Sequence, residues 1–261
     1  MVQNGLSQPV VSYETTKFFM NKISHLTVLL LLLFLATGEA LAAPAAAMHK
    51  KEKTLVILIH GFCKGADDMQ FWKKALAPEF TDVITPDLPT TFSSFETCLK
   101  ELTDTINAAK PHQYDHIYIA GHSMGGLLAR EYLHKHRPAN VRKLICVGTP
   151  HFGSKLADIA LYFPGAGWIW KPLHALKCSA RTKLTTPDIP NLEIAVITST
   201  NNGHWPGKLF LSDQADGLVD LTSAHAPDAK HVTSTAANHV KMQYDPETAA
   251  LIKKFFIHGK F

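Results

Sequence analysis

The stretch HIYIAGHSMGG, residues 116–126, carries the strongest structural signal in the chain. Its first part, residues 117–120, is an apolar run typical of a buried strand, and a helical pattern begins directly after Gly125. The pattern G-x-S-x-G between a strand and a helix is typical of a nucleophile elbow, a strained turn that exposes the serine hydroxyl at the sheet edge. Gly121 and Gly125 suit that turn because glycine lacks the Cβ that would separate the strand from the helix. The stretch therefore predicts that Ser123 is a nucleophile.

Strands and helices are expected to alternate on both sides of this stretch. The run at residues 54–59, TLVILI, is continuously apolar after its first residue, which is typical of a strand buried on both faces of a parallel sheet. Alternation of strands with longer helices indicates βαβ units. The predicted class is α/β, with a mostly parallel sheet of about six strands flanked by helices. The predicted strands are residues 54–59, 82–88, 117–120, 143–147, 192–198 and 230–234, and the predicted helices are residues 69–80, 94–110, 127–136 and 246–257.

The segment at residues 156–191 has no strand pattern and is long for a plain connection. Connections of this length usually form a lid or a binding loop. We therefore expect a short lid-like insertion here, whose Trp168 and Trp170 are candidates for substrate binding. An alternative, in which both tryptophans pack against the core, is equally compatible with the sequence.

The N-terminal segment has the features of an export signal. Lys22 precedes an apolar run at residues 26–36, and Ala40 and Ala42 form the A-x-A pattern of a cleavage site. The run is shorter than the roughly 20 residues that a membrane-spanning helix needs. We predict that residues 1–42 are a cleaved signal peptide, which implies a secreted or periplasmic protein. The mature chain, residues 43–261, is then a single domain, and translation could begin at Met1 or at Met20.

Composition argues against several classes of partner. The chain is 46% hydrophobic and 18% charged, as globular proteins are, and its formal net charge is only +4. No dense block of lysine and arginine is present in the sequence, so nucleic-acid binding is not expected. No cofactor motif stands out either, and the predicted partner is a small molecule.

The cysteine pattern does not predict a metal site. Cys63, Cys98, Cys146 and Cys178 could form three alternative sets of two disulfides in an oxidising compartment. Cys146 lies in an apolar strand-like run and is expected to be a buried free thiol. The sequence has neither a C-x-x-C motif nor the cysteine and histidine spacing of a zinc site, so we predict no structural metal.

A serine nucleophile needs a histidine base and an acid that orients the histidine. In proteins with this elbow the acid and then the histidine follow the serine along the chain. Asp216 follows a predicted strand and precedes Gly217, which permits a turn, and His239 follows the last predicted strand. These two residues are therefore the predicted acid and base. The alternatives that we weighed are Asp213 and Asp220 for the acid, and His225, His231 and His258 for the base.

An oxyanion that forms during acyl transfer needs two backbone donors. One is expected to be the N–H of Met124, directly after the nucleophile, and the other comes from the loop after the first strand. Phe62 is the predicted second donor because Gly61 lets the backbone turn inward. His122, inside the elbow, is expected to pack or to hydrogen-bond locally.

Together these motifs resemble the α/β-hydrolase superfamily, and within it the bacterial secreted triacylglycerol lipases and their esterase relatives. The matching motifs are HGF at residues 60–62, GHSMGG at 121–126, GTPHFGS at 148–154, DGLV at 216–219 and NH at 238–239. The resemblance implies the α/β-hydrolase fold and cleavage of carboxylic esters through an acyl-enzyme.

 The implied substrates are thus small-molecule esters or lipid esters such as acylglycerols, with transient contact to a lipid surface and with no cofactor.

The resemblance also implies roles for single residues. Ser123, Asp216 and His239 match the triad positions of the family, and Phe62 and Met124 match its oxyanion positions. Other members with a T-P-H-x-G-S element are deacylases that act on lipid anchors, so this element does not fix the substrate. Some of these lipases bind calcium through an aspartate two residues after the catalytic histidine, where this chain has Lys241, so no calcium is expected there. His151 of the same element is expected to be structural.

Two other functions remain compatible with the same residues. One is acyl transfer or amide cleavage by the same triad. The other is a non-catalytic scaffold that only binds its ligand, which the presence of every triad residue disfavours.

Overall fold

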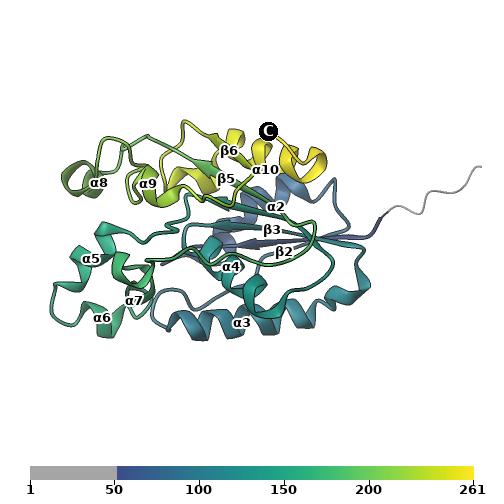
Figure 1. Ribbon diagram of the computed structural model, residues 1–261, viewed down its shortest axis with the longest axis horizontal. Helices are drawn as coiled ribbons and strands as arrows, with labels where there is room; N and C mark the ends of the chain where they lie inside the picture. Colours follow the sequence, from purple (N-terminus) through teal and green to yellow (C-terminus); the bar gives the residue numbers. More distant parts are fainter. Residues whose placement is uncertain (1–51) are drawn as a thin grey trace, which may run out of the picture. The chain divides into compact units, whose positions relative to one another are not determined.

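The computed structural model describes residues 52–261, so the predicted signal peptide, residues 1–42, lies outside the described residues. The described residues form one compact unit. Six strands form one sheet in the order β2-β1-β3-β4-β5-β6, and every neighbouring pair is parallel (Figure 1). The predicted α/β class with a parallel sheet of about six strands is therefore confirmed. The strands are β1 (Thr54–Ile59), β2 (Asp82–Ile84), β3 (His116–His122), β4 (Val141–Val147), β5 (Glu193–Thr198) and β6 (His231–Ser234).

Helices fill the connections between the strands. The α-helices are α2 (Gln70–Leu76), α3 (Phe95–Ala108), α4 (Met124–His136), α5 (Lys155–Leu161), α6 (Ala166–Ile169), α7 (Leu173–Leu176), α8 (Trp205–Phe210), α9 (Leu221–Ala224) and α10 (Pro246–His258). The 3-10 helices are η1 (Ala66–Met69), η2 (Pro111–Gln113), η3 (Cys178–Ala180) and η4 (Lys241–Tyr244). Helices α3 and α4 cover one face of the sheet, and α2 and α10 cover the other (Figure 1).

Local sequence signals explain where the longer helices begin and end. The Ser94 hydroxyl caps α3 by accepting from the Thr97 N–H at 3.2 Å. The Asp245 carboxylate caps α10 by accepting from the Thr248 N–H at 2.7 Å, and Gly259 ends this helix with a φ of 72°. These two helices start within one residue of the predicted positions.

Two predicted elements are shorter in the structure, and proline is the reason in each. Strand β2 ends at Ile84 rather than at residue 88, because Pro86 has no N–H for a sheet and restricts the residue before it. Helix α2 ends at Leu76 rather than at residue 80, because Pro78 cannot donate to the preceding helical turn.

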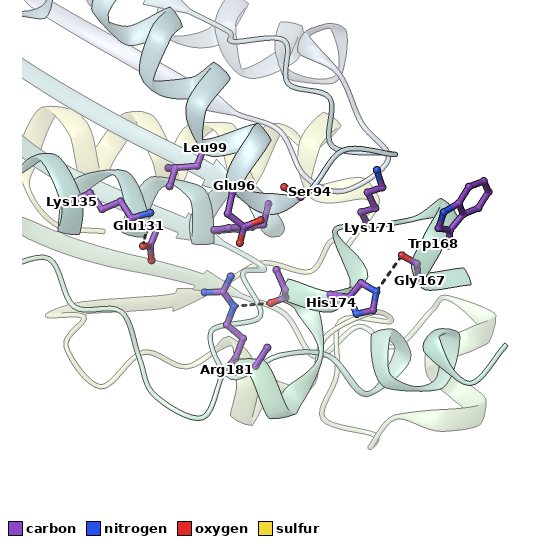
Figure 2. Close-up of a pocket in the computed structure, with 13 residues that line it drawn as sticks. Ser94, Glu96, Leu99, Glu131, Lys135, Gly167, Trp168, Lys171, His174 and Arg181 are labelled. Carbon is purple, nitrogen blue, oxygen red and sulfur yellow. Dashed lines mark hydrogen bonds and ion pairs between the residues drawn. The ribbon is translucent and has the colours of Figure 1, made fainter. Parts of the chain in front are cut away.

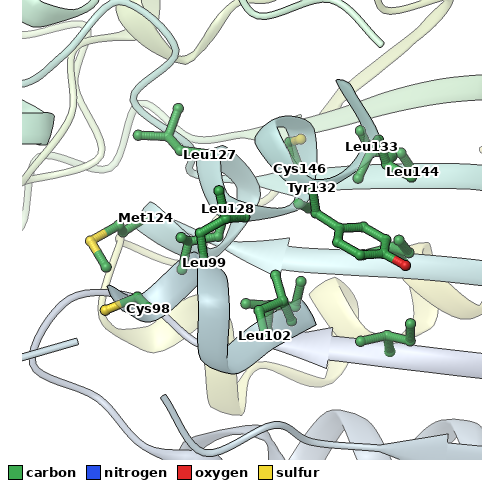
Figure 3. Packing of buried hydrophobic residues seen from close by; sticks show 14 of the residues in the cluster. Cys98, Leu99, Leu102, Met124, Leu127, Leu128, Tyr132, Leu133, Leu144 and Cys146 are labelled. Atoms are coloured by element: carbon green, nitrogen blue, oxygen red, sulfur yellow. The ribbon is translucent and has the colours of Figure 1, made fainter. Parts of the chain in front are cut away.

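The core consists of two layers, one on each face of the sheet. Leu55, Ile57 and Ile59 of β1 belong to the layer beneath α3 and α4, whereas Val56 and Leu58 belong to the layer beneath α2 and α10. This division follows from the strand geometry, in which successive side chains point to opposite faces. Figure 3 shows the first layer, where leucines of α3 and α4 pack over β4.

All four cysteines are free in this structure, and Cys146 is fully buried in the layer beneath α4, as predicted. The part of the chain that the structure describes holds no cluster of three or more histidine, cysteine or acidic residues suited to a metal ion. Within the same part, no helix is long and apolar enough to cross a membrane.

A buried ion pair joins helix α4 to the segment before β6. Arg130 is 1% exposed, and its guanidinium donates to both carboxylate oxygens of Asp228 at 2.9 Å. It also donates to the Thr185 carbonyl at 3.0 Å. A charge this deeply buried depends on its partner, because loss of the carboxylate leaves the guanidinium unpaired.

Replacing Asp228 by alanine is expected to lower the free energy of unfolding by about 3–5 kcal/mol, because it leaves the Arg130 charge unpaired. Urea unfolding monitored by circular dichroism measures this loss. The matched control is Lys135→Ala, which removes a solvent-exposed ion pair with Glu131 at 3.4 Å and should cost at most about 1 kcal/mol. Equal losses in the two variants would contradict the structural role of the Arg130 pair.

Candidate active site

Ser123 occupies a strained turn between β3 and α4. Its backbone has a φ of 54° and a ψ of −124°, a conformation that residues with a side chain rarely adopt. Two backbone bonds hold the turn: the Ser123 N–H donates to the Val147 carbonyl at 2.8 Å, and the Gly126 N–H donates to the Ser123 carbonyl at 3.0 Å. The turn predicted from the sequence therefore has the backbone geometry of a nucleophile elbow.

The glycines of the elbow are required by close backbone contacts. A Cβ added to Gly121 would lie 2.4 Å from the Gly126 nitrogen, and one added to Gly125 would lie 2.3 Å from the Ile59 carbonyl oxygen. Real side chains do not make contacts this short, so α4 could not sit against β3 and β1 with larger residues at these positions.

The structure brings Asp216 and His239 together although helix α9 and strand β6 separate them in the sequence. Nδ1 of His239 donates to Oδ2 of Asp216 at 2.7 Å, and the two residues are only 4% and 1% exposed. The other carboxylate oxygen of Asp216 accepts from the backbone N–H groups of Leu218 and Val219, at 3.0 and 2.8 Å. Because Nδ1 carries the donated proton, Nε2 of His239 is left as an acceptor, which is the state that a general base needs.

Glycines also make room for this acid–histidine pair. Gly217, directly after the acid, has a φ of 103°, so it supplies the turn expected at this position. A Cβ added to Gly148 would lie 3.2 Å from both Oδ2 of Asp216 and Nδ1 of His239. The end of β4 thus packs directly against the pair.

Ser123 and His239 line the same cavity, which has a volume of about 280 Å³. None of the alternative acids and bases weighed from the sequence is among the described residues that line it. Asp220 instead accepts from the Ser212 hydroxyl at 2.7 Å and pairs with Lys155 at 3.3 Å. His231 packs against the ring of Phe255.

The loop after β1 passes directly beside the serine. A Cβ added to Gly61 would lie 2.9 Å from the Cβ of Ser123, and Phe62 lines the cavity. The Thr90 hydroxyl holds this loop by donating to the Gly61 carbonyl at 2.8 Å. On the other side of the serine, Met124 is the first residue of α4, and its N–H therefore has no partner within the helix. The two predicted oxyanion donors thus belong to segments that flank Ser123.

His60 fixes the position of the same loop. Its Nε2 accepts from the Leu88 N–H at 3.0 Å, so the proton of the neutral ring lies on Nδ1, 3.1 Å from the Gly61 carbonyl. Burial lowers the pKa of His60, which keeps the ring neutral.

His122 packs inside the protein, as expected from the sequence, and it also makes a hydrogen bond to the histidine loop that the sequence did not indicate. Its Nε2 lies 3.0 Å from the carbonyl oxygen of His239, and its ring packs edge-on against Trp72. Burial, followed by the proximity of His239, lowers the pKa of His122 well below its usual range. The neutral ring donates through Nε2 to the His239 carbonyl and so ties β3 to the loop that carries the proposed base.

Aliphatic side chains of the insertion form one wall of the cavity. They come from α5 and α7, and sequence analysis did not assign any of them to the site. Their signal in the sequence is the short helical spacing of apolar residues within the insertion, which becomes informative only once the helices are placed over the serine. These residues are Leu156, Ala157, Ala160, Leu173 and Leu176.

The two tryptophans of the insertion lie outside this wall. Trp168 is 81% exposed and borders a second, more open cavity of about 770 Å³ between the insertion and helices α3 and α4 (Figure 2). In that cavity the Arg181 guanidinium stacks over the Phe95 ring at 4.8 Å and donates to the Ala175 carbonyl at 2.8 Å. Trp170 is not among the described residues that line either cavity. The inward positions of the insertion are occupied by the smaller aliphatic residues, so neither tryptophan contacts the cavity at Ser123.

Stability is expected to fall in mild acid because buried histidines must become charged. Burial lowers the pKa of His60, His122 and His151 in the folded chain, so the unfolded chain binds more protons below its own histidine pKa of about 6.5. Each of them should lower the free energy of unfolding by up to about 1.4 kcal/mol per pH unit as the pH falls below about 6.5. Urea unfolding at several pH values between 8 and 5 measures how steeply the free energy of unfolding changes with pH.

His151 offers the sharpest variant for that measurement, because neither ring nitrogen has a hydrogen-bond partner within the described chain. His151→Leu should therefore reduce the pH dependence of the unfolding free energy. A slope identical to that of the unmodified protein would show that His151 is not a source of the acid sensitivity.

Comparison with known proteins agrees with this architecture. Residues 54–167, which include β1, the elbow and α4, match the family model for the alpha/beta hydrolase fold. The chain is an α/β-hydrolase-fold protein. The match covers Ser123 but ends before Asp216 and His239, so the geometry described above is the observation that links these two residues to the serine.

Solved structures with a fold similar to that of this chain include bacterial lipases and esterases. The mature lipase BlEst2 of Bacillus licheniformis has a TM-score of 0.62 and 17% identity, with 79% of this chain and 92% of that chain covered. The metagenomic carboxyl esterase MGS0156 has a TM-score of 0.58 and 13% identity, with 80% and 74% covered. The product of gene lin2722 of Listeria innocua has a TM-score of 0.56 and 18% identity, with 79% and 94% covered. At these identities the likeness shows the fold, and the search of curated sequences found no significant match.

Proposed function

We propose that this α/β-hydrolase is a serine esterase that cleaves carboxylic esters through an acyl-enzyme, with Ser123, His239 and Asp216 as its triad. The observation that carries the proposal is the buried bond between Nδ1 of His239 and Asp216, formed beside a cavity that the strained Ser123 also lines. The strained backbone of Ser123 costs stability. Together with the buried pair of His239 and Asp216, it forms the arrangement that activates a serine hydroxyl.

In the first half of the proposed reaction, the Ser123 oxygen attacks the ester carbonyl carbon while Nε2 of His239 takes the hydroxyl proton. The negative charge that develops on the carbonyl oxygen is bound by the backbone N–H groups of Phe62 and Met124. When the carbon–oxygen bond to the alcohol breaks, His239 returns the proton to the leaving oxygen. The products of this half are a free alcohol and an acyl group on Ser123.

Water completes the cycle by the same steps. Nε2 of His239 takes a proton from a water molecule, whose oxygen attacks the acyl carbonyl, and the same N–H groups bind the second oxyanion. Collapse of this intermediate releases the carboxylic acid, and the proton on His239 returns to the Ser123 oxygen. Asp216 keeps its charge throughout and orients the imidazole.

The acyl chain is proposed to lie against the aliphatic wall formed by α5 and α7. A cavity of about 280 Å³ lies at the lower end of the range for small-molecule sites, so short acyl chains are favoured. A series of p-nitrophenyl esters from acetate to palmitate tests this, and kcat/KM should be greatest for the short chains. Absence of hydrolysis across the whole series would overturn the proposed function.

Contact with a lipid surface is part of the same proposal. Large apolar side chains are exposed on α6, α8 and the turn before α6, and α5 contacts α8. Large apolar side chains exposed on a protein surface can mark a place that binds lipid or protein. Activity toward a short-chain ester above its micelle threshold should therefore exceed the activity extrapolated from lower concentrations. These exposed residues are Tyr162, Phe163, Trp168, Trp205 and Leu209.

Export to the periplasm or the medium remains a proposal that rests on residues 1–42. If they are a signal peptide, the N-terminus of the mature protein, determined by Edman degradation, should be Ala43. A mature protein that retains residues 26–36 would contradict this assignment.

A further inference from the structure

Two polar side chains of the cavity at Ser123 have hydrogen-bonding atoms without a partner. Gln243, in η4, is 0% exposed, and neither its carboxamide oxygen nor its nitrogen has a hydrogen-bond partner within the described chain. The same is true of Nδ1 of His122. Both residues line the cavity that also contains Ser123 and His239. Buried polar groups are normally paired, so these atoms indicate that the cavity receives a polar group from outside the chain.

The unpaired atoms define the kind of group that fits. Nε2 of the neutral His122 ring donates to the His239 carbonyl at 3.0 Å, so Nδ1 carries a lone pair and can only accept. The Gln243 carboxamide can both donate and accept. A hydroxyl group also does both, so it matches the hydrogen-bonding needs of either residue.

Charge near the cavity favours a neutral group over an anion. Lys64 also lines the cavity, but its ammonium group pairs with Asp68 at 3.2 Å. No other lysine or arginine is among the described residues that line this cavity. An anionic substrate group would therefore find no free cation there, whereas a hydroxyl needs none.

The position of Gln243 indicates which part of the ester it contacts. Gln243 lies four residues after His239, in the 3-10 helix η4 that follows the histidine. In the proposed reaction His239 lies beside the leaving alcohol, because it gives the alcohol oxygen its proton. The aliphatic wall of α5 and α7 is instead suited to the acyl chain. The polar atoms of Gln243 and His122 thus belong to the alcohol side of the cavity.

We propose that Gln243, together with His122, binds a free hydroxyl group on the alcohol part of the substrate, so that Gln243 determines specificity for monoesters of polyols. This inference rests on the proposed function and extends it to the substrate class. A site built to hydrogen-bond a substrate hydroxyl discriminates strongly against an analogue that lacks it, because its own polar groups are then left unpaired.

Two substrates with the same acyl group test this proposal: glyceryl monobutyrate and propyl butyrate, whose three-carbon alcohols differ only in the free hydroxyl groups. The unmodified protein should show a kcat/KM at least about 10-fold higher for the glyceryl ester. The variant Gln243→Met, of similar size, should lower this ratio by about 10-fold or more. Lys241→Met, at an exposed position on the same 3-10 helix, is the matched control and should keep the ratio of the unmodified protein.

The outcomes separate the possible roles of Gln243. Equal loss of activity toward both esters in Gln243→Met would assign the residue to packing and overturn the proposal, as would an unchanged ratio. A preference of the unmodified protein for propyl butyrate would overturn it without any variant, so the test does not depend on the variant folding. Failure of the unmodified protein to hydrolyse either ester would instead contradict the proposed esterase function.

Discussion

Replacing Ser123 by alanine is expected to lower kcat for ester hydrolysis by roughly 10⁶-fold, as in other serine hydrolases that lose the nucleophile. The variant loses the oxygen that forms the acyl-enzyme, while the oxyanion donors and the cavity stay in place. The fold should persist, because the Ser123 side chain makes no hydrogen bond as the cap of α4. Rates with p-nitrophenyl butyrate, together with a thermal melt of the same sample, measure both effects.

Ser154 provides the matched control for this substitution. It lines the same cavity, but its hydroxyl donates to the Leu218 carbonyl at 2.9 Å and is thus already engaged. Ser154→Ala should retain activity within about 10-fold, since it removes a single neutral hydrogen bond. If Ser123→Ala retained as much activity as Ser154→Ala, another residue would have to be the nucleophile.

Replacing Asp216 by asparagine is expected to lower kcat by roughly 10⁴-fold, the loss known for the corresponding change in a serine protease. The oxygen that accepts from the N–H groups of Leu218 and Val219 must remain an oxygen, so the new amide nitrogen would face Nδ1 of His239. That nitrogen is a donor, and it would move the imidazole proton to Nε2. The histidine could then no longer take the proton of Ser123.

Asp220 is the control for this prediction, because it lies in the same part of the chain but contacts Ser212 and Lys155 instead of His239. Asp220→Asn should change kcat by less than about 10-fold. A larger loss in Asp220→Asn than in Asp216→Asn would show that the acid of the triad is Asp220. The comparison is made at pH 8 for all variants.

The elements that could be predicted from the sequence are those whose limits are determined by local signals. Strand β1 is apolar at every position after Thr54, and α10 has both a capping aspartate and a terminal glycine, so their limits could be predicted closely. The elbow is likewise encoded within a few residues, since its glycines allow the backbones of adjacent segments to come into close contact. Helices α8 and α9 were not predicted, because segments of six and four residues are too short to show helical periodicity.

The composition of the cavity could not be predicted in the same way. Leu156 and Leu173 line it because α5 and α7 fold back over the serine, and no local pattern encodes that return. The bond from His122 to His239 joins residues 117 positions apart, and the unpaired carboxamide of Gln243 is visible only in three dimensions. Sequence reasoning therefore identified candidates for the chemistry but not the residues proposed to select the substrate.

The most direct test of the account is covalent labelling of the serine. Purified protein treated with a fluorophosphonate should gain the mass of one probe, and tryptic peptide analysis should place that mass on Ser123. The Ser123→Ala variant should remain unlabelled, and His239→Ala should label much more slowly because the hydroxyl loses its base. Folded protein that gains no label, or that gains it on another residue, would contradict the assignment of Ser123 as the nucleophile.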